Sequence, residues 1–83
     1  MEESYRKFVA TEIQKRIVDL RSRGVTTSKG EPMSMAAIGR TLDAPVTRTA
    51  MYNVRDGRSE SRRIKAAIER ELGRAYWIRR EAA

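Results

Sequence analysis

The sequence contains neither cysteine nor histidine among its 83 residues. Without cysteine there can be no disulfide and no thiolate metal site, and without histidine the usual zinc ligands and the commonest general base are missing. The carboxylates are scattered, and no glycine-rich phosphate loop precedes a predicted helix. Glu69 and Glu71 fall on different faces of their predicted helix, so they do not form a pair for a metal ion. We therefore expect a protein that is not an enzyme and has no metal or cofactor.

Helix-breaking residues and long apolar runs are also scarce. The chain has two prolines and five glycines, and no apolar run approaches membrane-spanning length. The first four residues are acidic rather than basic and apolar, unlike a secretory signal. Since β-branched residues do not alternate in runs, helix is the expected structure. We expect a cytoplasmic protein with no membrane partner and no small-molecule ligand.

Positive charge, by contrast, is abundant. Eighteen basic residues against eleven acidic ones give a net charge of +7, and fourteen of the eighteen are arginine. This balance favours a polyanionic partner, and the planar arginine fork matches phosphate groups and guanine edges. A GC-rich genome is a partial alternative explanation for the arginine content.

The pattern of apolar residues and capping residues predicts one domain over residues 1–78, followed by a flexible basic tail over 79–83. A first helix is expected to start after Ser4 as N-cap, to run to about Arg23 and to end at Gly24. Residues 24–33 are expected to form a loop in which Val25 folds back as an apolar anchor. The predicted buried stripe of the first helix consists of Tyr5, Phe8, Val9, Ile13, Ile17 and Leu20.

Three further helices are predicted after the loop. Ser34 is expected to cap a short helix that runs through Leu42, and Thr47 a helix over 48–56 that ends at Gly57. Ser59 is expected to cap a helix over 60–72 that ends at Gly73. The last helix should bury Ile64, Ala67, Ile68 and Leu72, and the chain should then fold Tyr76, Trp77 and Ile78 back over the core. The predicted fold is an all-α bundle of four to five helices.

The second and third predicted helices have the pattern of a helix-turn-helix. Gly39 follows the buried Ile38, where two helices that cross closely need a small residue. Leu42 should pack inward from the second helix, and the third helix should bury Met51 and Val54 beside the small residue Ala50. The predicted turn over 43–46 is longer than in a compact helix-turn-helix. If the register is shifted, Ala50 and Val46 take the inward positions instead.

This assignment predicts which side chains face outward. The candidates for contact with base edges are Thr47, Arg48, Thr49, Tyr52 and Asn53, since arginine reads guanine, asparagine reads adenine and threonine can touch a thymine methyl group. The candidates for contact with phosphate are Ser34, Arg55, Arg58, Ser59 and Arg62, in part because helix N-termini attract anions. Each residue also has an ordinary interpretation: solvated arginine, half-buried tyrosine or a serine that only caps its helix.

The segments 38–42, 50–58 and 59–68, with Leu72, Gly73 and Trp77, resemble λ-repressor-like (Cro-type, XRE) DNA-binding domains. More narrowly, they are similar to the small Ner-like regulators of Mu-like phages and prophages. The resemblance covers most of residues 13–78. It implies a five-helix bundle, binding of an operator by a dimer and transcriptional control in a bacterial host, where the protein would be associated with the nucleoid. The long turn and the loop over 24–33 depart from the family pattern.

Three functions therefore remain open at this point. The first is a phage or prophage transcriptional regulator, in particular a repressor, that binds double-stranded DNA as a homodimer. The second is a DNA-binding accessory factor for transposition or excision that bends DNA. The third is a helical module for protein interaction or RNA binding, although the few aromatic residues do not form a stacking platform.

Overall fold

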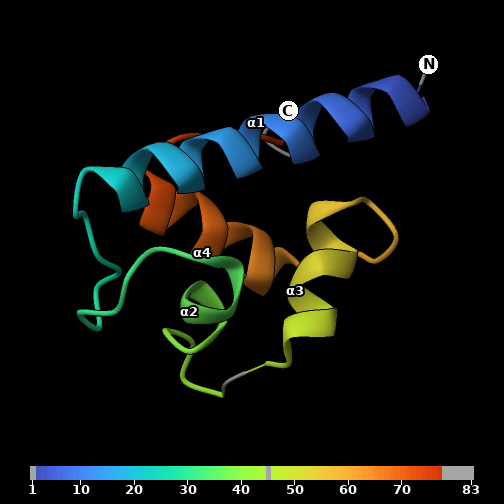
Figure 1. Ribbon diagram of the computed structural model, residues 1–83. Coiled ribbons are helices and arrows are strands. Elements are labelled where there is room, and N and C mark those ends of the chain that lie inside the picture. Colours follow the sequence, from blue (N-terminus) through green and yellow to red (C-terminus); the bar gives the residue numbers. More distant parts are fainter. Residues whose placement is uncertain (1, 45, 78–83) are drawn as a thin grey trace.

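The computed structural model describes residues 2–44 and 46–77, apart from the side chain of Glu2 (Figure 1). These residues form the helices α1 (Glu2–Ser22), α2 (Met35–Gly39), α3 (Arg48–Arg55) and α4 (Arg62–Leu72), and no strand. The all-α prediction with four helices is confirmed. No described helix has the length and apolarity needed to cross a membrane.

Helix α1 lies across the bundle and packs against α3 and α4, while α2 packs against the same two helices (Figure 1). Its buried side chains are Val9, Ile13, Ile17 and Leu20, as the periodicity predicts. Phe8 is 61% exposed and Tyr5 is 39% exposed, so their assignment to the buried stripe was wrong. Phe8 precedes Val9 and is turned about 100° away from it around the helix axis.

Of the two ends of α1, the C-terminal end at Gly24 is as predicted and the N-terminal end is not. The helix already includes Glu2, so Ser4 lies inside it and is not its N-cap. At the other end Gly24 has a φ of +78°, its N–H donates to Arg21 O, and the Val25 N–H donates to Leu20 O. These two bonds form a Schellman motif. Val25 contributes its backbone there, but its side chain is 41% exposed and does not anchor the loop.

The loop after α1 is held against the bundle by polar contacts. The buried Thr27 accepts hydrogen bonds through Oγ1 from the N–H groups of Lys29 and Glu31. Ser28 donates from its backbone N and from Oγ to the two carboxylate oxygens of Glu71, at 2.9 and 2.7 Å. The loop is thereby joined to α4 before the chain enters α2.

Helix α4 begins later than predicted, because Ser61 rather than Ser59 is its N-cap. Ser61 Oγ accepts from Ile64 N at 3.2 Å. Gly57 ends α3 with a φ of +80°, and the Arg58 N–H donates to Asn53 O, which leaves the next residues in a turn. The predicted buried face of α4 is confirmed by the burial of Ile64, Ala67, Ile68 and Leu72.

After α4 the chain returns along the bundle. Gly73 is left-handed, and Tyr76 and Trp77 are half-buried against the core, as predicted. Glu69 Oε2 accepts hydrogen bonds from the backbone N–H groups of both aromatic residues. The predictions for Ile78 and for the tail over 79–83 lie outside the described residues.

Candidate nucleic-acid interface

The helix pair α2–α3 has the two predicted N-caps. Ser34 Oγ accepts from Ala37 N at 3.0 Å, and Thr47 Oγ1 accepts from Ala50 N at 3.1 Å. Helix α2 ends at Gly39, however, and does not continue through Leu42. Thr41 Oγ1 donates to Ile38 O, and the chain turns there although Leu42 is still buried. The connection between the two helices is therefore longer than the predicted turn over 43–46.

The crossing of α2 and α3 depends on Gly39. A Cβ atom at this position would lie 3.1 Å from Met51 Cγ and 3.3 Å from Val46 O. Met51 is fully buried and Val54 is 1% exposed, while Val46 and Ala50 pack at the edge of the core. The predicted register of α3 is thus confirmed, and the shifted register is excluded.

With this register, the first turns of α3 present polar side chains to solvent. Thr47, Arg48 and Thr49 are exposed, and Tyr52 is 37% exposed. Asn53 is half-buried, so it is the least accessible of the five candidates for base contact. The structure therefore brings four of these candidates together on the outer side of one helix.

Arg55 differs from the other candidates because it is already engaged within the fold. Its guanidinium carbon lies 4.6 Å from the centre of the Tyr52 ring, a cation–π geometry. Its Nε donates to Asp56 Oδ1 at 2.9 Å and its Nη1 donates to Gln14 Oε1 at 3.4 Å. The side chain thus connects α3 to α1 and lies against the ring of Tyr52.

Three arginines around α3 have no partner in the described part of the chain. The side chains of Arg48, Arg58 and Arg62 are exposed, and among the described residues no hydrogen bond, ion pair or ring contact engages these side chains. Some other exposed arginines are ion-paired, as Arg40 is with Glu31 and Arg23 with Asp19. Positive charge that the fold does not neutralise is therefore found at the start of α3 and between α3 and α4.

The serine candidates and one further arginine have structural positions that alter their interpretation. Ser34 is half-buried and its oxygen is used in capping, while Ser59 is exposed and does not cap α4. Sequence reasoning missed Ser61 as the cap. It also missed Arg63, whose Nη2 donates to Ala44 O and connects α4 to the α2–α3 connection. The Arg63 contact joins segments 19 residues apart, so no local pattern could have indicated it.

The acidic residues of the described ranges do not form a metal site. No group of three or more aspartate or glutamate side chains there is placed to hold a metal ion. Glu71 accepts hydrogen bonds from the loop serine Ser28, and Glu69 from the backbone after α4. Both carboxylates therefore have structural partners.

Comparison with known proteins adds no relative. No protein-family model matches the chain, and neither the curated proteins nor the solved structures contain a match.

Proposed function

We propose that this protein binds double-stranded DNA sequence-specifically, with α3 in the major groove, and that it regulates transcription in a phage or prophage. The observation that carries the DNA-binding part is the exposure of Thr47, Arg48, Thr49 and Tyr52 together on a capped helix. The regulatory part rests on the resemblance of segments 38–42 and 50–68 to Ner-like proteins.

The chemistry of these residues suits both kinds of DNA contact. Arg48 can donate two hydrogen bonds to guanine O6 and N7, and the threonines can contact a thymine methyl group or a phosphate. Within the described ranges the side chains of Arg58 and Arg62 have no partner, so they could pair with phosphates without breaking a contact there. Because one such module covers only a few base pairs, we propose that two copies bind adjacent half-sites.

The decisive experiment compares Arg48→Ala with Arg23→Ala. Both variants lose one exposed arginine and hence one positive charge, but Arg23 lies beyond the end of α1 and is paired with Asp19. A binding site is first selected from random duplex DNA, and binding to that site and to a scrambled duplex is then measured over a range of salt concentrations.

We expect wild type to prefer the selected site by about 10³-fold or more. Arg48→Ala should lose about 1–3 kcal/mol of binding energy on that site only, while Arg23→Ala keeps the preference. If no site is selected, sequence-specific binding is excluded. If Arg48→Ala weakens both duplexes equally and lowers the salt slope by about one charge, Arg48 contacts phosphate and the DNA-bending function becomes the better explanation.

A further inference from the structure

Helix α3 carries one aromatic side chain, Tyr52, which is 37% exposed. Its ring lies against the guanidinium group of Arg55, with 4.6 Å between the guanidinium carbon and the ring centre. Within the described ranges, no hydrogen bond engages the hydroxyl of Tyr52. Because the residue is exposed, this hydroxyl is a donor that the fold leaves to a partner outside the chain.

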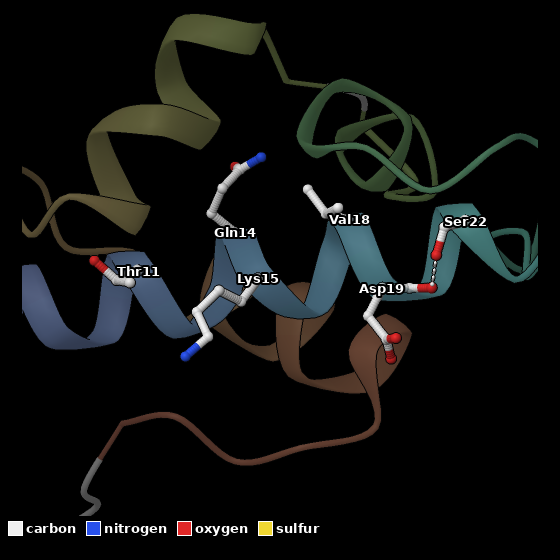
Figure 2. A pocket seen from close by; sticks show the side chains of 6 residues that line it. All are labelled: Thr11, Gln14, Lys15, Val18, Asp19 and Ser22. Carbon is white, nitrogen blue, oxygen red and sulfur yellow. Dashed lines mark hydrogen bonds between the residues drawn. The ribbon is translucent and has the colours of Figure 1, made fainter.

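The guanidinium group of Arg55, by contrast, is engaged by three groups of the protein. Nε donates to Asp56 Oδ1 at 2.9 Å, Nη1 donates to Gln14 Oε1 at 3.4 Å, and the Tyr52 ring lies against it. Figure 2 shows Gln14 pointing from α1 toward the side on which α3 lies. The Arg55 side chain is only 19% exposed. Its position therefore suits it to hold the Tyr52 ring rather than to contact DNA itself.

The position of Tyr52 on α3 distinguishes it from the residues that point straight outward. Since successive helical residues are turned by about 100°, Thr49 lies nearly opposite the buried Met51 and Val54. Tyr52 is turned about 60° to one side of Thr49 by the same geometry. It also lies one turn beyond Arg48, whereas a recognition helix reads base edges with its N-terminal residues. With α3 in the major groove, Tyr52 consequently faces the wall of the groove, which consists of phosphate groups.

We propose that the Tyr52 hydroxyl donates a hydrogen bond to a DNA phosphate and that Arg55 is the positioning residue for this contact. The inference rests on the proposed function and adds to it how α3 is held in the groove, since phosphate contacts fix the register and orientation of a protein on the duplex. It assigns Tyr52 to the DNA backbone rather than to a base edge.

The charge beside the ring favours an anionic acceptor. A cation against the face of an aromatic ring attracts the electron density of that ring, which makes the phenol a stronger hydrogen-bond donor. The positive charge of Arg55 also attracts a phosphate. Asp56 offsets part of this charge, but it bonds to the Nε edge of the guanidinium group and not to the ring. Since hydrogen bonds to ionised acceptors are the stronger ones, a phosphate gains more from this donor than a neutral base edge does.

Tyr52→Phe tests the contact, because it removes only the hydroxyl. On the selected site we expect the affinity to fall about tenfold, the effect of losing one hydrogen bond to a charged group. The cost of each single base-pair substitution in the site should stay the same. Tyr76→Phe is the matched control: it removes a hydroxyl that is buried and has no partner in the described part of the chain, and it should leave the affinity unchanged.

Uncharged methylphosphonate linkages, placed at each position of the selected site in turn, identify the phosphate. At one position the linkage should weaken the binding of wild type but have little further effect on Tyr52→Phe, in which the contact is already lost. Arg55→Gln should reduce the effect of the linkage at that same position. Arg55→Lys, which keeps a cation beside the ring, should restore most of it.

A changed base-pair preference in Tyr52→Phe would assign the hydroxyl to a base edge and overturn the inference. Unchanged affinity, or methylphosphonate effects that are the same in Tyr52→Phe and wild type at every position, would overturn it too. Equal losses for Arg55→Lys and Arg55→Gln would refute the positioning role of the Arg55 charge. With a selected site in hand, each of these results leaves the proposed function intact. Failure to select any site would instead refute that function, and this inference with it.

Discussion

Gly39 and Met51 lie so close that a methyl group on the glycine would be 3.1 Å from Met51 Cγ and 3.3 Å from Met51 Sδ. This approach positions α3, and through it the exposed residues from Thr47 to Tyr52. Since Met51 is fully buried, it has little room to move aside.

A larger side chain at position 39 should therefore weaken the fold. We expect Gly39→Val to lower the free energy of unfolding by about 1–3 kcal/mol, the usual effect of overpacking. Urea denaturation measures the change. Combining it with Met51→Ala should cost less than the sum of the two single variants, because the shortened side chain leaves space. Simple additivity would show that the two residues do not compete for space.

The two serines before α4 provide a matched pair. Ser61→Ala should destabilise the protein by about 0.5–2 kcal/mol, because the Ile64 N–H loses its acceptor. Ser59→Ala, at an exposed position in the preceding turn, should have little effect. Thermal or urea unfolding of both variants tests this assignment, and a larger loss for Ser59→Ala would reverse it.

Arg55 and Arg62 should affect DNA binding differently. If Arg55 positions Tyr52, Arg55→Gln should weaken binding to the selected site but leave the slope of affinity against salt unchanged. Arg62→Gln should lower that slope by about 0.9, the value for one phosphate contact. Salt titrations of the two variants against wild type make the comparison. A reduced slope for Arg55→Gln would show that its internal contacts open and that it binds phosphate.

The contact between Ser28 and Glu71 should make stability depend on pH. Burial raises the pKa of the Glu71 carboxyl, but the hydrogen bonds from Ser28 and the nearby Arg70 outweigh burial and lower it below the ordinary 4.5. The unfolded chain therefore takes up the proton first as the pH falls. The contribution of Glu71 is complete above the ordinary pKa and is lost as the pH falls through the lower pKa of the folded state.

Urea denaturation of wild type and Glu71→Gln at several pH values measures this contribution. The difference in stability between them should be largest near neutral pH and should shrink below pH 4.5. Contributions from Asp19 and Glu60, whose pKa values are also lowered, cancel in the difference. If the difference in the free energy of unfolding stays constant with pH, the negative charge of Glu71 does not contribute to stability.

Local patterns were sufficient to predict much of this fold. Ser34 and Thr47 could be recognised as caps because a cap acts on residues two or three positions away. The buried residues of α4 follow equally from a short periodic pattern. Ser59 and Ser61 both precede the same apolar face, however. Which of the two caps the helix depends on the backbone path of the turn after Gly57, and a local sequence pattern does not give that path.

Other features depend on packing between distant segments. Periodicity places Phe8 near a helix face, but whether another element covers it is decided by the rest of the bundle. The engagement of Arg55 by Gln14 joins residues 41 positions apart, and it could not be predicted from either neighbourhood. For the same reason, the sequence placed Arg55 among the candidate arginines but could not distinguish it from Arg48, Arg58 and Arg62, whose side chains have no partner among the described residues.

The hydrogen bond from the Tyr5 hydroxyl to Tyr76 O, at 3.0 Å, brings the first and last parts of the described chain together. We therefore expect the helices to pack in the same way when they are connected in a different order. A circular permutant with the original ends joined by a linker and new ends opened beside the exposed Gly30 would retain every interhelical contact described above. In such a chain α2 and α3 would be synthesised before α1. The side chains that these helices bury against α1 would therefore stay exposed until α1 had been synthesised.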